Sequence, residues 1–114
     1  MIMVQSTFQL NPESKNSVMT LMKEMAGLCR EEHGCISYEY YEGITDSCQI
    51  ILLQEWENAD CLQEHYRTEH MADFLEKLSG FLKSPVSTRS YAVSYTHLRA
   101  HETVLDLVCR LLLE

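Results

Sequence analysis

The 114-residue chain lacks an apolar run long enough to cross a membrane, and its first residues lack the basic region and apolar length of a secretory signal peptide. It also has few basic residues, because nine Lys and Arg stand against 17 Asp and Glu and give a formal net charge of −8 at pH 7. Polyanions such as DNA, RNA or an anionic bilayer would be repelled by that charge. We therefore expect a cytoplasmic protein that binds neither nucleic acid nor membrane.

Metal-binding motifs are missing as well. The five cysteines are scattered, odd in number and without a Cys-x-x-Cys pair, so they predict neither a disulfide framework nor a zinc site. His65 and His70 have neither the His-Glu-x-x-His spacing nor another spacing that shares one helix face. We expect no metal, and most cysteines should be buried as small hydrophobic residues.

The composition is that of one compact domain, with 46% hydrophobic residues in a length typical of a single core. Residues 2–10 alternate with period two, which predicts a first strand. Asn11 as N-cap and Pro12 at the first helical position then predict a helix. Its apolar residues recur at helical spacing, and we expect it to close at His33, with Gly34 as a left-handed cap.

Two further strands, at residues 35–42 and 48–57, are expected to flank a hairpin loop. One face of the first of them should carry Ile36, Tyr38 and Tyr40. The centre of the second, residues 50–53, is apolar on both faces, so both faces of the sheet need cover. Helices can cover only one face, and the simplest second layer for so short a chain is another copy of the same subunit.

Asn58 is predicted to cap a second helical region, which is interrupted near Thr68 and then continues until Gly80 and Pro85. The first part of this region should share a face made of Ala59, Leu62 and Tyr66. The continuation should share a face made of Met71, Phe74, Leu75, Leu78 and Leu82. Residues 86–93 alternate again and predict a fourth strand. The order β-α-β-β-α-β predicts an α+β fold, a ferredoxin-like subunit with an antiparallel four-stranded sheet.

Three short motifs follow one another along the chain: residues 31–35 (EEHGC) before a tyrosine-bearing strand, residues 54–57 (QEWE) at a strand end, and residues 65–71 (HYRTEHM). Together they resemble the antibiotic biosynthesis monooxygenase domain, in particular its quinol monooxygenase-like bacterial members. The resemblance covers roughly residues 1–93. It implies a homodimer that forms an α+β barrel, and cofactor-independent oxygenation of a quinol or related aromatic by dioxygen, without metal, flavin or haem.

That chemistry needs a base near neutral pH, because an aromatic diol reacts with dioxygen far more readily as its anion, and histidine suits this role. His70 and His65 are the candidate catalytic residues, and His70 is the first choice. On an unbroken helix they would point apart, so both can face one cavity only if the helix breaks, and Thr68 as an N-cap offers that break. The candidate substrate-binding residues are Trp56, Tyr38, Tyr40 and Tyr66.

Each candidate also has a purely structural interpretation. Trp56 at a strand end can be an anchor of the core or of an interface, and Tyr38 and Tyr40 can be ordinary strand residues. His65 can be an exposed helix residue, and His70 a polar residue of the first turn.

Two other functions are compatible with the motifs. Relatives with this domain are similar to isomerases of phosphorylated, sugar-derived signals, for which Arg67 and Arg89 are the candidate phosphate partners. The other is a dimeric module that binds a small molecule without chemistry, since a fold does not fix a function. A haem-degrading activity is disfavoured, because the first strand lacks the asparagine that this resemblance would require.

Residues 94–114 depart from the family. They look similar to translated sequencing-adaptor read-through, and we give them no role in function. The alternative is a genuine helix packed on the dimer, with an apolar face made of Leu105, Val108, Leu111 and Leu112.

Overall fold

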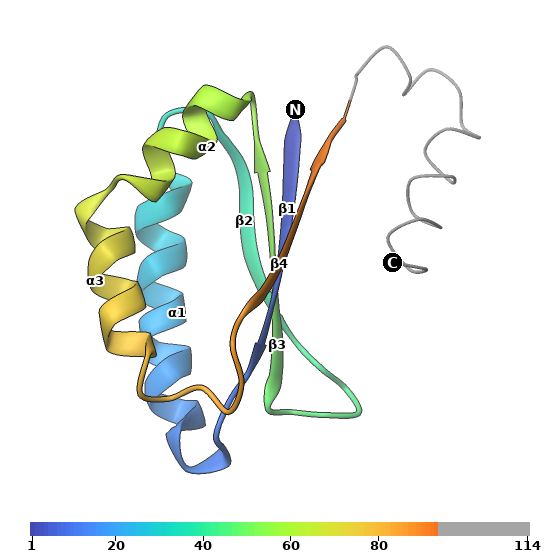
Figure 1. Cartoon of the computed structure of the whole chain (residues 1–114), viewed down its shortest axis with the longest axis vertical. Helices are drawn as coiled ribbons and strands as arrows, with labels where there is room; N and C mark the ends of the chain where they lie inside the picture. Colours follow the sequence, from blue (N-terminus) through green and yellow to red (C-terminus); the bar gives the residue numbers. More distant parts are fainter. Residues whose placement is uncertain (94–114) are drawn as a thin grey trace.

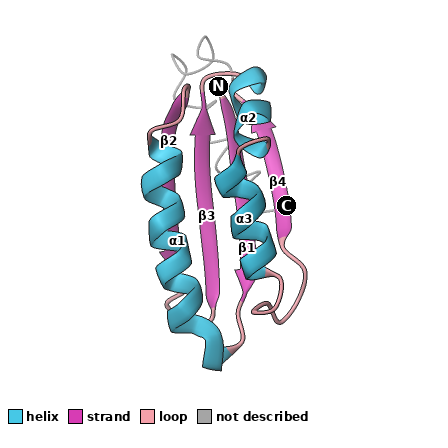
Figure 2. Cartoon of the chain, turned by 90° about the vertical axis from the view of Figure 1, so that its left-hand side faces the viewer, coloured by secondary structure: helices cyan, strands magenta, loops and turns pink. Residues whose placement is uncertain are grey.

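The structure, a computed structural model, describes residues 1–93, and both interpretations of the tail therefore lie outside the described residues. One antiparallel sheet of four strands, in the order β2-β3-β1-β4, carries all the helices on one face (Figures 1 and 2). The elements are β1 (Ile2–Gln9), η1 (Pro12–Ser14), α1 (Lys15–Arg30), β2 (Cys35–Glu42), β3 (Gln49–Trp56), α2 (Ala59–Tyr66), α3 (Glu69–Leu78) and β4 (Ser87–Ala92). The predicted β-α-β-β-α-β ferredoxin-like fold is confirmed.

Strand β1 lies between β3 and β4, and its alternation sets which side chains enter the core. Val4, Ser6 and Phe8 are buried beneath the helices, as the period of two predicts. Helix α1 contributes Met22 and Cys29, among others, to the same core. Each fully buried aliphatic or aromatic side chain adds about 1.5–3 kcal/mol relative to exposure, so this layer supplies most of the stability of the subunit.

The first helix begins and ends differently from the prediction. Asn11 makes no side-chain cap, and residues 12–14 form a 3₁₀ turn before α1 starts at Lys15. The helix ends at Arg30 rather than His33, because the chain turns sharply to enter β2. Gly34 does adopt the predicted left-handed conformation, with φ of 80°, but it ends this turn rather than the helix itself.

Strand β2 has the predicted bounds, yet only part of its predicted face points inward. Tyr38 is buried and Tyr40 is half-buried under the helices. Ile36 is 46% exposed, because the pairing with β3 shifts between Cys35 and Ser37 and leaves it as the extra residue of a bulge.

The predicted inward face of the first helical segment is right only for Leu62, which is partly buried and packs against the core. Helix α2 buries Cys61 and His65, whereas Ala59 and Tyr66 are exposed. A count of apolar residues missed this face because a thiol and an imidazole make it up.

Helix α3 follows its prediction more closely. It buries Phe74 and Leu78, while Leu75 is 49% exposed and Leu82 lies beyond the helix, in a bridge with Leu10. No helix within residues 1–93 has both the length and the apolar character needed to cross a membrane.

Candidate functional site

Two imidazoles converge on one carboxylate where three segments meet. Glu32 lies in the turn after α1, His65 in the last turn of α2 and His70 in the first turn of α3. His65 Nδ1 lies 2.9 Å from Glu32 Oε2, and His70 Nε2 lies 2.8 Å from the same oxygen. Because an ionised carboxylate only accepts hydrogen bonds, both ring nitrogens act as donors.

A helix break brings the two histidines together. Thr68 caps α3 by accepting a hydrogen bond from the Met71 N–H at 3.3 Å, and its hydroxyl donates to the His65 carbonyl at 2.8 Å. The predicted break at Thr68 is therefore present. It ends α2 at Tyr66 and starts α3 at Glu69 in a new direction, so His70 reaches back to the same carboxylate.

The turn that holds Glu32 is fixed at both ends. The Glu32 N–H donates to the Cys29 carbonyl at 3.1 Å, and its carbonyl accepts from the Cys35 N–H at 3.2 Å. The Gly34 carbonyl accepts from the Glu57 N–H at 2.9 Å, which ties the turn to the end of β3. These backbone hydrogen bonds fix the position of the residue whose side chain carries the carboxylate.

The charge on Glu32 follows from two opposing effects. The side chain is only 13% exposed, and burial raises its pKa. The hydrogen bonds from His70 and His65 outweigh burial and hold the pKa of Glu32 below its usual value. Glu32 is therefore a carboxylate at neutral pH, able to fix the His65 tautomer that carries its proton on Nδ1.

The His65 ring is fully buried among aromatic side chains. Its centroid lies 4.8 Å from that of Trp56, 5.8 Å from Tyr38 and 5.4 Å from Tyr66. Its Nε2 is buried without a hydrogen-bond partner, a state that typically costs about 1–3 kcal/mol. With the proton on Nδ1, this nitrogen presents an unshared lone pair to an apolar surrounding.

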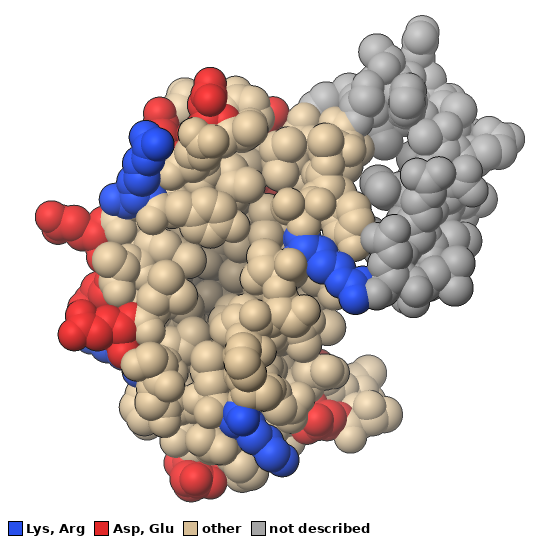
Figure 3. All heavy atoms as spheres, in the orientation of Figure 1, with Lys and Arg blue, Asp and Glu red and all other residues tan. Residues whose placement is uncertain are grey.

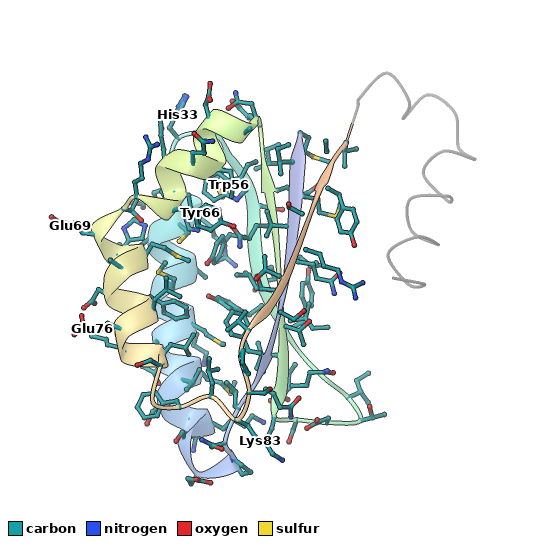
Figure 4. The ribbon with its side chains drawn as sticks, in the orientation of Figure 1. His33, Trp56, Tyr66, Glu69, Glu76 and Lys83 are labelled. Carbon is teal, nitrogen blue, oxygen red and sulfur yellow. The ribbon has the colours of Figure 1, made fainter. Side chains whose placement is uncertain are left out.

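The predicted aromatic residues are held in different ways. Trp56 is buried and its Nε1–H donates to Gln54 Oε1 at 2.9 Å. The hydroxyls of Tyr38 and Tyr40 lie 3.4 Å apart, and burial raises the pKa of both, so both stay protonated. Tyr66 is half-exposed and covers the His65 ring, and Figure 4 shows Trp56 and Tyr66 between α2 and the sheet.

Two of the pockets within residues 1–93 are each lined by one of the predicted residues, Tyr40 in one and His70 in the other. A pocket of about 330 Å³ between α1 and β2 is lined by Tyr40, Met22 and Ala26, among others. His70 lines a smaller hollow of about 40 Å³ between α1 and α3. Neither pocket is lined by His65 or Trp56. Figure 3 shows a further hollow between α3 and β4, with charged side chains around it rather than in it.

The sequence reasoning missed Glu32 and Cys29 as members of this site. The ligand atoms of Cys29, Glu32, His65 and His70 all lie within 4.8 Å of one another. Residue spacing along a single helix does not reveal this cluster, because its members come from three segments. The only available signal was the acidic pair before Gly34, in the motif at residues 31–35.

The four-stranded antiparallel sheet with its helices on one face places the chain in the class of small α+β proteins with a ferredoxin-like fold. The family model described as antibiotic biosynthesis monooxygenase matches residues 1–77. The chain belongs to the antibiotic biosynthesis monooxygenase family, as the motifs predicted.

Individual relatives agree with this assignment. The uncharacterised protein sll1783 of Synechocystis is 28% identical over 95 residues, which cover 83% of this chain but only 65% of that protein. Rv0793 of Mycobacterium tuberculosis, named as a candidate monooxygenase, is 26% identical over 86 residues, or 75% of this chain and 84% of that one. A conserved protein of Methanosarcina mazei has a solved structure with a TM-score of 0.79, 27% identity and coverage of 82% and 92%.

Proposed function

We propose that this protein is a cofactor-independent monooxygenase that oxidises a quinol or a related aromatic small molecule with dioxygen. The observation that carries the proposal is His65, whose Nδ1–H donates to Glu32 while its buried Nε2 has no partner. Removal of a phenolic proton requires a base with a fixed tautomer. It also requires a lone pair that no other group occupies, as on the His65 Nε2 in its apolar surroundings. Family membership and the name of Rv0793 support the same reaction class.

In the proposed mechanism, His65 Nε2 accepts a phenolic proton, and Glu32 stabilises the resulting imidazolium. The substrate anion then transfers an electron to dioxygen, and the two radicals combine at a ring carbon to give a peroxide anion, which takes the proton back from the His65 imidazolium and becomes a hydroperoxide. Loss of water from the hydroperoxide leaves the oxygenated quinone. One oxygen atom of O₂ enters the product and the other leaves as water, and the substrate supplies all the electrons.

The roles of the two histidines differ in this proposal. His70 is 26% exposed and its Nε2 is committed to Glu32, so we assign it as a positioning residue that holds the carboxylate toward His65. His65 has the free ring nitrogen and is the proposed base. His70 as the base is the competing assignment.

The aromatic side chains supply the walls of the proposed substrate site. Trp56 offers a flat apolar surface, and the protonated hydroxyls of Tyr38 and Tyr40 offer hydrogen bonds that orient a ring. Tyr66 shields His65 and is half-exposed, so its ring has to move aside as a substrate enters. The uncharged hollow between α3 and β4 (Figure 3) supports entry from that side.

Oxygen consumption tests the reaction class. Metal-free protein with a panel of quinols and anthrones in air should consume dioxygen faster than the uncatalysed rate. With ¹⁸O₂, one labelled atom should appear in each product molecule, and catalase should leave oxygen consumption unchanged because no free peroxide forms. Absence of oxygen consumption, together with conversion of a phosphorylated sugar-derived compound that proceeds equally under nitrogen, would instead support an isomerase. Binding without turnover across the panel would support the non-catalytic module.

A homodimer is also part of the proposal. The helices cover one face of the sheet (Figure 1). The alternating burial along β3 places the half-buried Ile51 and Leu53 on the opposite face. Leu53 pairs with Gln5 on β1 and Glu39 on β2, so it lies in the middle of this face. Two such faces packed together would remove the apolar side chains of both copies from water.

Substitution of Leu53 by Lys should therefore convert the dimer into a monomer, because two buried ammonium groups would face each other at the centre of the interface. Light scattering after size-exclusion chromatography measures the mass directly. Ile44→Lys is the matched control, since Ile44 is fully exposed in the β2–β3 loop, and it should leave the mass unchanged. A dimer that survives Leu53→Lys would show that the subunits pair elsewhere.

A further inference from the structure

A set of metal-ligand side chains converges beside the proposed base. Cys29 Sγ, a Glu32 oxygen and one nitrogen each of His65 and His70 lie within 4.8 Å of one another. Cys29 and His65 are fully buried, and Glu32 and His70 are 13% and 26% exposed. Side chains of this kind, drawn from three segments, are the donors of protein zinc sites.

The geometry is close to that of a tetrahedral ion. Bonds of about 2.0–2.3 Å to nitrogen, oxygen and sulfur place the ligand atoms of a zinc ion roughly 3.3–3.8 Å apart. The two imidazole nitrogens lie 2.9 and 2.8 Å from the Glu32 oxygen and would move outward by less than about 1 Å. The widest pair, within 4.8 Å, would move inward by a similar amount.

The charge and the access also suit a cation. Within residues 1–93 no Lys or Arg pairs with Glu32, so its negative charge is met by the two imidazoles and by a hydrogen bond from the Cys29 thiol. His70 lines a hollow that Glu24 and Asp73 also line, and the lysine beside it, Lys77, is paired with Asp73 at 2.9 Å. A cation can approach His70 past these carboxylates.

We propose that Cys29, Glu32, His65 and His70 form a binding site for a divalent ion of the zinc class, which includes Co²⁺. A thiolate, a carboxylate and two imidazoles favour such ions over Mg²⁺ and Ca²⁺, which take oxygen ligands. The thiolate and carboxylate balance the charge of the ion, and binding releases the thiol proton. Coordination through His65 Nδ1 replaces its hydrogen bond to Glu32, so the bound ion and the proposed proton transfer exclude each other.

Cobalt spectroscopy tests the site without substrate. Reduced, EDTA-treated protein titrated with Co²⁺ should develop the d–d bands of a tetrahedral ion and a thiolate-to-cobalt charge-transfer band, saturating at one ion per chain. Zinc should displace the cobalt and raise the melting temperature. Cys29→Ser should abolish the charge-transfer band, and His70→Ala should weaken Zn²⁺ binding by more than the ~10–100-fold that loss of an outer partner costs.

Cys48→Ser is the matched control, because Cys48 lies in the β2–β3 loop, outside the cluster. The cobalt spectrum of this variant should equal that of the unaltered protein. Absence of the charge-transfer band in the unaltered protein, or its persistence in Cys29→Ser, would overturn the proposal. The readout is independent of the proposed function, since oxygen consumption is measured with EDTA present and cobalt binding with no substrate. Where the oxygenase activity and the metal site are both present, Zn²⁺ should inhibit oxygen consumption and EDTA should restore it.

Discussion

Replacing His65 with Gln is expected to lower kcat/KM for aromatic oxidation by roughly 10²–10⁴-fold, the usual contribution of a positioned general base. Glutamine keeps much of the volume of the imidazole but has no basic nitrogen, so the loss isolates the proton transfer. The measurement is initial oxygen consumption against substrate concentration, with EDTA present. Because His65 is buried, circular dichroism and the melting temperature must show that the variant is folded.

The Glu32 carboxylate should affect catalysis by orienting the His65 ring and not by contacting the substrate. In Glu32→Gln the amide can donate to His65 Nδ1, which would place the proton on Nε2, where the substrate needs an acceptor. We expect a fall in kcat with little change in KM, and a matched Glu31→Gln variant with unchanged kinetics, since Glu31 is exposed and outside the cluster. Normal kcat in folded His65→Gln and Glu32→Gln proteins would refute His65 as the base.

Replacing Gly34 with Ala is expected to destabilise the protein by about 2–5 kcal/mol, from two separate causes. A left-handed φ of 80° costs a residue with a Cβ roughly 1–2 kcal/mol. The new Cβ would also collide with the side chain of Cys61, whose own Cβ would lie 2.7 Å away, and such overpacking costs typically 1–3 kcal/mol. Chemical denaturation by urea measures the change in the free energy of unfolding.

Gly27 provides the control for this substitution. It lies in α1, and no neighbouring atom lies within 4 Å of the place that an alanine Cβ would take, so Gly27→Ala should stabilise the protein by about 0.4–1 kcal/mol. Opposite signs at the two glycines would confirm that the turn before β2 needs glycine specifically. Equal and small effects would mean that the turn relaxes, and the placement of Glu32 would then be less rigid than its backbone hydrogen bonds indicate.

The elements were predictable where side chains repeat with the period of the backbone. The alternation in β1 gave its buried face, and Asn58 and Thr68 gave the starts of α2 and α3, where both side chains do accept a backbone N–H. Prediction failed where a local irregularity broke the period, as at the bulge that exposes Ile36. It failed again where polar residues were buried, as in the inward face of α2.

The sequence by itself determined the fold class, the family and the residue types available for chemistry, because these depend on local periodicity and on short motifs. Only the tertiary structure decided which side chains meet. Glu32 lies 33 residues from His65 and 38 from His70, and the helix break at Thr68 and the turn at Gly34 bring all three within hydrogen-bond distance. Spacing along one helix cannot express such a contact, because it arises from the packing of three segments against one sheet.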